Sequence, residues 1–255
     1  MSLQDHKGAV KNAEKLKARK RVFAIAAPIA IACAAFAIVL AALITPGLNS
    51  QTLSLSEAEI GSTVFFGSYE QDNDISNGKE EIEWIVLAKE VDKALVISRF
   101  ALDCGLYDTA MSDVTWETCA LRKWLNGPFL NAFSAEERDH IIDTAVTADK
   151  NPSFSTPPGN DTVDKVFLLS ITEVNSYFGS DEARKCEPTE YAKAQGVWTS
   201  SRFSNAGGAA CWWLRSPGSL PDHAAIVLVE GSVETDGRGV FNILGGIRPT
   251  MWIGW

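Results

Sequence analysis

The sequence predicts an α+β domain, in which short helices pack against twisted antiparallel strands, preceded by one transmembrane helix. Three observations lead to this prediction. Residues 22–44 form an apolar run without a charged residue. From residue 60 onward, short β-rich stretches alternate with short helical patterns and turn residues. Finally, the tryptophan-rich segments 211–218 and 245–252 indicate paired or neighbouring core strands, because tryptophan buries a large apolar surface.

The apolar run is long enough to be a membrane anchor. Its 23 residues would span the roughly 30 Å hydrocarbon core as a helix. Residues 1–21 carry seven Lys/Arg and two acids, and such a basic flank favours the cytoplasmic side. We therefore expect a cytoplasmic tail (1–21), a transmembrane helix (22–44), a spacer (45–59) and an extracytoplasmic domain (60–255), giving a single-pass protein of the cell membrane. A cleaved signal peptide is the alternative, although its apolar region is usually about 7–15 residues long.

Charge narrows the class of partner. Residues 22–255 carry 16 basic and 30 acidic residues, a net charge of −14. Such a domain repels phosphate-rich polymers, which argues against nucleic-acid binding. The expected partners are the membrane, through residues 22–44, and a cell-wall, glycan or protein ligand.

The first half of the domain predicts a meander followed by two helices. Strands are expected over 60–69, 81–87 and 94–98, with turns at Asn77-Gly78 and 91–93. A helix over 116–125 would be capped by Thr115 or Asp113, and Ser134 opens a capping box for a second helix that reaches Ile142. The loop 149–164, rich in proline, is long enough to be either mobile or functional.

The second half predicts further strands around short helices. Residues 165–170 read as a buried strand, and helices are expected over 172–178 and 188–194. Strands are expected over the ranges 212–215, 224–230, 232–234 and 247–253. Pro249 cannot donate to a strand ladder, so the last strand should be bulged there or lie at an edge.

The predicted core contains large side chains and two arginines. We place Trp84, Trp124, Trp212, Trp213 and Arg248 in the core. A buried arginine needs a compensating charge, so Arg215 and Arg248 are each expected to have an acidic partner within the fold.

The order of several motifs resembles a widespread bacterial family of extracytoplasmic domains without an assigned function. The resemblance covers residues 60–255 and rests on FG-x-Y (66–69), I-x-W-x-VL (82–87), W-x-x-x-x-LR-x-WLN (116–126), VFLLS (166–170), WWLRSPG (212–218) and G-I/V-RP (246–249). That family is similar to C-type-lectin-like domains and to formylglycine-generating enzymes. The resemblance implies a C-type-lectin-like fold whose final hairpins frame a binding face. Glu187-Pro188-Thr189 departs from the Glu-Pro-Asn triplet of calcium-dependent sugar binders, and no Trp-Asn-Asp triplet occurs.

The sequence contains no clear motif for a metal site, a cofactor or a catalytic group. Asn160, Asp161 and Asp164 have calcium-type oxygens without the spacing of a known calcium loop, so no metal and no cofactor is predicted. No serine–histidine–aspartate context or CxxC motif occurs. Disulfide pairing stays open among the four cysteines of the outer domain, which are Cys104, Cys119, Cys186 and Cys211.

Two functions of different classes follow. The favoured hypothesis is a membrane-anchored extracytoplasmic binding or interaction domain, with candidate ligand-binding residues Arg215, Asp222, His223 and Arg238 in or beside its last loops. The alternative is a formylglycine-generating-enzyme-like oxidase, which would use Cys186 and Cys211, or another cell-surface modifying enzyme.

Overall fold

The computed structural model describes residues 54–199, 208–241 and 243–255, which belong to one compact unit spanning Thr52–Trp255. The predicted cytoplasmic tail and transmembrane segment lie outside these residues. None of the helices in the described ranges is both long and apolar enough to cross a membrane. The unit combines strands with a few short helices, which confirms the predicted α+β class.

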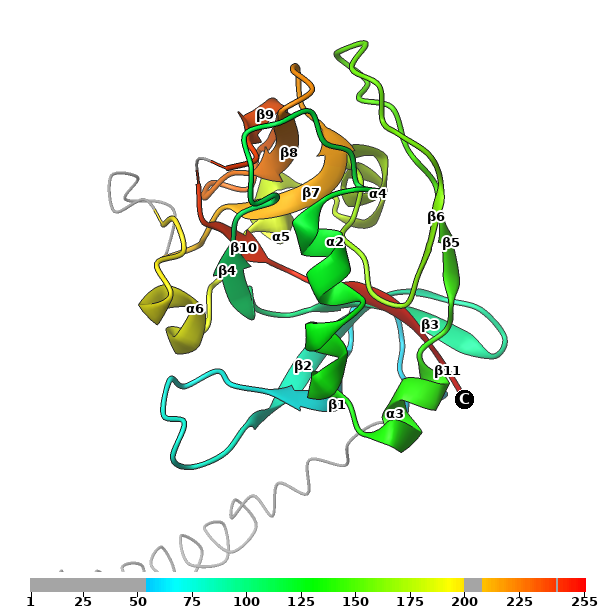
Figure 1. The fold of residues 1–255 in the computed structure, drawn as a ribbon. Helices are drawn as coiled ribbons and strands as arrows, with labels where there is room; N and C mark the ends of the chain where they lie inside the picture. The colour runs from blue at the N-terminus through cyan, green and yellow to red at the C-terminus, as the bar shows by residue number, and fades with distance from the viewer. Residues whose placement is uncertain (1–53, 200–207, 242) are drawn as a thin grey trace, which may run out of the picture. The chain divides into compact units, whose positions relative to one another are not determined.

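A four-stranded antiparallel sheet forms one part of the fold (Figure 1). In spatial order its strands are β1 (Thr63–Tyr69), β2 (Glu80–Lys89), β3 (Lys93–Ser98) and β11 (Thr250–Gly254). The predicted meander is therefore confirmed, and β11 completes it at the edge of β3. Gly78 adopts a φ of +108° in the turn between β1 and β2, a conformation that favours glycine.

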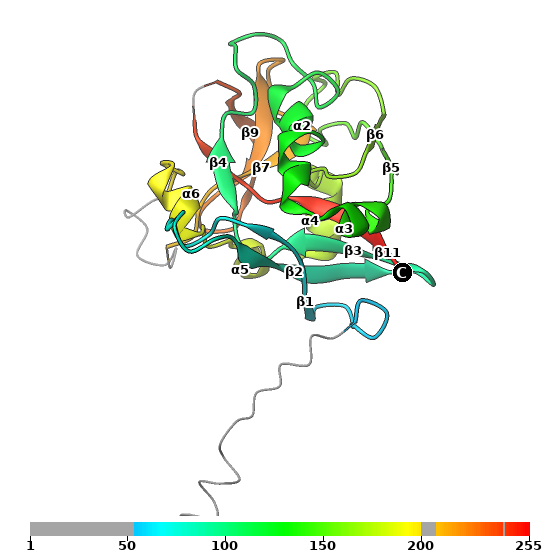
Figure 2. The ribbon, with the colours of Figure 1, turned by 60° about the horizontal axis from the view of Figure 1, so that its bottom comes forward.

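A five-stranded sheet lies beyond the first one, as Figure 2 shows from a second side. In spatial order its strands are β4 (Asp103–Gly105), β10 (Gly245–Ile247), β7 (Trp212–Pro217), β8 (His223–Val227) and β9 (Val233–Gly239). Strand β7 pairs antiparallel with β8 and parallel with β10, where Gly246 faces Trp212. The two tryptophan-rich segments are thus neighbours, as predicted. The short strand β4 was not predicted.

The chain changes sheets at Arg248 and Pro249. The prediction of one strand over 247–253 is wrong, because β10 ends at Ile247 and β11 begins at Thr250 in the other sheet. Pro249 has no N–H for either ladder, but its carbonyl accepts a 2.9 Å hydrogen bond from the Ser98 amide. The proline therefore marks the crossing point between two sheets.

The helices are short, and several boundaries differ from the prediction. The first begins four residues later than expected and is capped by the sulfur of Cys119, which accepts from the Arg122 amide at 3.3 Å. The capping box at Ser134 is confirmed, although its helix ends at His140. The helical segments are α2 (Ala120–Leu125), η1 (Pro128–Ala132), α3 (Ala135–His140), α4 (Ile171–Tyr177), α5 (Asp181–Arg184) and α6 (Glu190–Ala194).

The predicted strand over 165–170 is buried but does not form a strand. Only Phe167 bridges to Thr250 of β11. The side chain of Asn126 instead satisfies this backbone, accepting from the Lys165 and Val166 amides at 2.8 and 3.1 Å and donating to the Val166 carbonyl at 2.8 Å. An amide side chain thus replaces a neighbouring strand, which an apolar run alone does not reveal.

The core contains most of the predicted residues, and the two arginines differ. Trp84, Trp212 and Trp213 are fully buried, whereas Trp124 is partly buried against the core. Arg215 is paired with carboxylates, as predicted. For Arg248 the prediction is wrong: no carboxylate of the described residues lies within salt-bridge distance. Its Nε donates to the Ser98 carbonyl at 2.9 Å, and the guanidinium lies 5.3 and 5.0 Å from the rings of Phe178 and Trp212.

Candidate functional site

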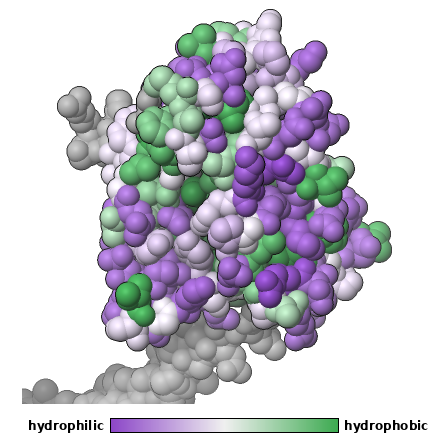
Figure 3. Space-filling model, viewed as in Figure 1, coloured by the Kyte–Doolittle hydropathy of each residue, from purple (hydrophilic) through white to green (hydrophobic). Residues whose placement is uncertain are grey.

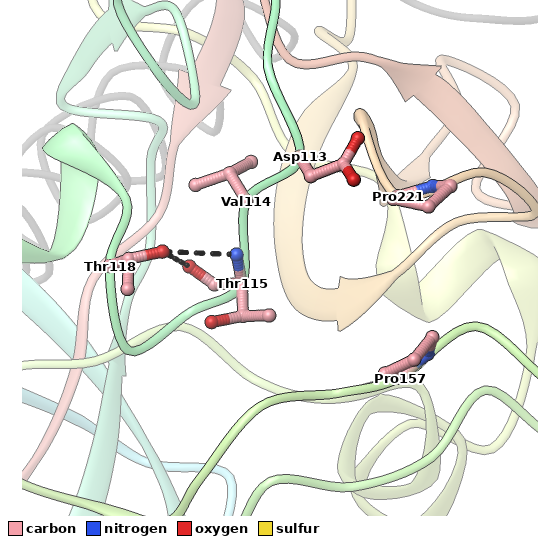
Figure 4. A pocket seen from close by; sticks show the side chains of 6 residues that line it. All are labelled: Asp113, Val114, Thr115, Thr118, Pro157 and Pro221. Carbon is pink, nitrogen blue, oxygen red and sulfur yellow. Dashed lines mark hydrogen bonds between the residues drawn. The ribbon is translucent and has the colours of Figure 1, made fainter.

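A pocket of about 360 Å³ opens where three connecting segments meet (Figure 4). We call it the loop pocket. Its lining comes from the segment before α2, from the proline-rich loop 149–164 and from the turn between β7 and β8, and consists of Asp113, Val114, Thr115, Thr118, Pro157 and Pro221. In Figures 1 and 2 these segments lie at the end of the fold away from β1 to β3.

The segment before α2 is fixed to the five-stranded sheet. The Val114 amide donates to the Pro221 carbonyl at 3.0 Å, and the Asp108 amide donates to the Val240 carbonyl at 3.1 Å. The carboxylate of Asp108 accepts from the Ala120 amide at 2.8 Å, at the first residue of α2. One wall of the pocket is therefore held at both ends.

The loop 149–164 is docked along its length. The buried Asn151 donates to the carbonyls of Pro217 and Thr235 at 2.8 and 2.7 Å. Gly159 has a φ of +87°, and a Cβ there would lie 2.6 Å from the Thr115 hydroxyl oxygen. Only glycine allows this close approach, which brings the loop against the segment before α2. The strand β6 (Thr162–Asp164) ends the loop and pairs with β5 (Thr144–Val146).

The oxygens considered for calcium have partners within the fold. Asp164 accepts from the Trp116 indole at 2.9 Å and from Arg122 at 2.7 Å. Asn160 donates to Glu117 at 2.9 Å, and Asp161 accepts from the Ala148 amide at 2.8 Å. These side chains stabilise the ends of the loop.

The polar groups of the loop pocket are few. The Thr118 hydroxyl accepts from the Thr115 amide at 3.2 Å and donates to the Thr115 carbonyl at 3.4 Å, as the dashed lines in Figure 4 show. The carboxylate of Asp113 is exposed and has no hydrogen-bond or ion-pair partner among the described residues. The remaining walls are Val114 and two prolines. Among the described residues that line the pocket, none forms a nucleophile–base pair.

Two of the four predicted ligand-binding residues, Asp222 and His223, adjoin the loop pocket in sequence, and the third, Arg238, lies in β9. Asp222 follows the pocket residue Pro221 and contacts His223, with Oδ1 and Nδ1 2.8 Å apart. Arg238 pairs with Glu234 at 2.8 Å and stands next to Ala224 in the β8–β9 ladder. These residues share one end of the sheet and are partly exposed.

Arg215, the fourth, points into the core. Its guanidinium forms a two-bond contact with Glu173 of α4, in which one N–O distance is 2.8 Å, and donates to the Leu168 carbonyl at 2.8 Å. Only 3% of its side chain is exposed. All these bonds are internal, so Arg215 joins β7 to α4 and leaves no donor directed at solvent.

Cys104, Cys119, Cys186 and Cys211, the cysteines of the described residues, are free. Burial raises the pKa of Cys119 and of Cys211 to about 12, and that of Cys104 to about 11. Burial also raises the pKa of Cys186, although the neighbouring Arg248 partly opposes this. Thiols that stay protonated in a core are poor nucleophiles, so no observation favours the oxidase alternative through Cys186 and Cys211.

One carboxylate group outside the loop pocket has the spacing of a cation site. Ligand oxygens of Glu70, Asp72 and Glu80 lie within 4.8 Å of one another. Two of the three carboxylates are held within the β1–β2 turn, whereas the buried Oε1 of Glu70 has no hydrogen-bond partner among the described residues. Glu80 accepts from the Gln71 amide at 2.6 Å, and Asp72 accepts from Asn77 at 2.7 Å.

A comparison with known families decides where this domain belongs. A family model described as "Domain of unknown function (DUF6273)" matches residues 91–255. The chain belongs to this DUF6273 family. No curated protein and no solved structure matches the chain. The DUF6273 match begins at the β2–β3 turn, later than the expected start at residue 60, and it includes the whole five-stranded sheet and every residue of the loop pocket.

The pocket itself was only partly foreseen. The sequence singled out Asp113 and Thr115 as helix caps and 149–164 as a long loop, but no pattern brought them together with Pro221. The close approach of Gly159 to Thr115 is the decisive contact, and a glycine after two prolines does not identify its partner.

Proposed function

We propose that this DUF6273 protein is a membrane-anchored extracytoplasmic binding domain that holds its ligand in the loop pocket. The pocket carries the proposal: its three walls are fixed to the fold by hydrogen bonds, and its lining offers binding groups without a catalytic pair. Its volume of about 360 Å³ lies at the lower end of the range for small-molecule sites.

The anchor part of the proposal rests on the sequence. The uncharged run 22–44 follows a tail with seven Lys/Arg, which is the arrangement expected of a single-pass protein with its C-terminal part outside. A C-type-lectin-like architecture is part of the same proposal, supported by the order of the motifs and by the loops gathered at one end.

Filling the pocket tests the binding function. Thr118→Trp would place an indole in the pocket, whereas Asn131→Trp adds the same side chain at an exposed position of η1. Full-length protein in detergent micelles would be screened by saturation-transfer NMR against cell-wall glycan fragments and short peptides. We expect ligands that bind the wild type and the Asn131 variant but not the Thr118 variant. Ligands that bind all three proteins equally would place the site elsewhere.

A further inference from the structure

We infer that the loop pocket receives a lysine side chain from an exposed segment of a partner protein. The inference rests on the proposed function of the same pocket and specifies the chemistry of its ligand. It combines three features of the site: an unpartnered carboxylate, apolar walls and exposed apolar residues beside the mouth.

The charge of the pocket favours a cation. Asp113 is the lining residue with a formal charge, and no other group of the described residues neutralises it. The sequence neighbours Glu117 of Thr118 and Asp222 of Pro221 are also acidic, and no lysine or arginine lines the pocket. An ammonium group would find its counter-ion here, whereas a phosphate or carboxylate ligand would be repelled.

The walls suit the aliphatic stem of lysine. In Figure 4, Pro157 and Pro221 lie on one side of the pocket and Val114 lies on the other. Lysine buries its methylene groups along apolar surface while its ammonium stays near water. In the loop pocket, the carboxylate of Asp113 lies next to the apolar walls, so it could bind the ammonium of a lysine whose methylene groups pack against them.

A sugar fits this lining poorly. Sugar rings usually need several free hydrogen-bonding groups, and here the Thr118 hydroxyl is already bonded to the Thr115 backbone. The Thr115 side chain packs against Gly159. No aromatic side chain lines the pocket to stack on a ring.

The surroundings favour a polypeptide over a free amine. Met111 and Leu220 belong to the segments that line the pocket, and they are 66% and 52% exposed. Figure 3 shows hydrophobic surface on the upper part of this face, where Figure 1 places β8, β9 and the segment before α2. Exposed apolar residues next to a small pocket are typical of a protein-binding surface.

Three probe peptides separate the parts of this proposal. Full-length protein in micelles would be titrated with Ac-Gly-Lys-Gly-NH₂, its norleucine analogue, which keeps the stem without the ammonium, and its glutamate analogue. A chito-oligosaccharide and free butylamine complete the set. We expect saturation transfer to the lysine methylene protons, roughly tenfold weaker binding of the norleucine peptide, and no binding of the glutamate peptide. Butylamine should bind more weakly than the lysine peptide.

Charge-matched variants locate the effect. Asp113→Asn should weaken lysine-peptide binding roughly tenfold, and Asp139→Asn on the distant α3 should leave it unchanged. Equal binding by both variants, or equal binding of the lysine and norleucine peptides, would overturn the inference. Tighter binding of the oligosaccharide than of the lysine peptide would also overturn the inference. If Thr118→Trp abolished that oligosaccharide binding, the proposed binding function of the loop pocket would still stand. If no probe or screened ligand distinguishes Thr118→Trp from Asn131→Trp, both proposals fail.

Discussion

Single residues in the core determine how neighbouring strands of the five-stranded sheet fit together. The indole of Trp213 donates to the Gly105 carbonyl of β4 at 2.9 Å, across the intervening strand β10. A Cβ at Gly245 of β10 would lie 2.5 Å from Trp213 Nε1, so glycine is needed where the ring crosses that strand. The sequence predicted that Trp213 is buried, but not which glycine it requires.

Substitutions at Trp213 and Asp222 should affect stability differently, because the first residue lies in the core and the second at the surface. Trp213→Ala removes a fully buried side chain and its hydrogen bond, so we expect the free energy of unfolding to fall by roughly 3–5 kcal/mol. Asp222→Ala changes a partly exposed side chain and should leave stability nearly unchanged. Denaturant unfolding of both variants measures the difference. Equal stability would show that β7 is not part of the core.

The Arg215–Glu173 pair gives a second residue-scale prediction. Glu173→Gln would leave the 3%-exposed guanidinium of Arg215 without its main counter-ion, so we expect a loss of roughly 3 kcal/mol. Arg215→Met with Glu173→Gln removes both charges but keeps an acceptor for the Ser170 amide in the capping box of α4, so it should restore part of the stability. A double variant that is less stable than the single one would contradict this account.

At the scale of elements, local signals predicted some boundaries and tertiary contacts decided others. The capping box at Ser134 was readable because both of its members lie within one turn. The segment 165–170 was misread as a strand because its backbone partner is the side chain of Asn126, some 40 residues away. Strand β4, with only three residues, had too little periodicity to detect.

The capping box of α3 should make stability depend on acid pH. Partial burial raises the pKa of Glu137, but hydrogen bonds from the Ser134 and Gly67 amides together outweigh it and hold the pKa below its usual value. Its contribution is therefore complete above the unfolded pKa of about 4.3 and is lost as pH falls through the lower folded value. Glu137→Gln should reduce this acid loss in unfolding curves measured between neutral and acid pH. An unchanged slope would contradict the assignment.

The docked loop gives a prediction about one glycine. Gly159→Ala would place a methyl group against Thr115 at a positive φ, so we expect a loss of about 1–3 kcal/mol and weaker binding at the loop pocket. Gly179→Ala is the matched control, because nothing lies within 4 Å of its added Cβ. Thermal unfolding and the same peptide titration measure both effects. Equal behaviour of the two variants would mean that the loop is not held by this contact.

At the scale of the whole molecule, the fold explains why the class was predictable and the pocket was not. Period-two patterns and turn residues predicted the meander, which depends on neighbours in sequence. The loop pocket joins segments around residues 114, 157 and 221, whose contacts depend on the sheet order β4-β10-β7-β8-β9. In that order β10 lies next to β4, although more than a hundred residues separate the two strands in the chain. No local sequence pattern can therefore predict it.

The proposed anchor makes a prediction about orientation. If residues 22–44 span the membrane with the tail inside, a membrane-impermeant amine reagent on intact cells should label Lys79 and Lys150, which are exposed, and should not label Lys7, Lys11 or Lys15. Lysed cells, in which mass spectrometry should find both groups labelled, are the control. Labelling of the tail on intact cells would show that the orientation is the reverse of the one proposed. Release of a protein that lacks residues 1–44 would instead identify the apolar run as a signal peptide, and the loop pocket would then act on a secreted domain.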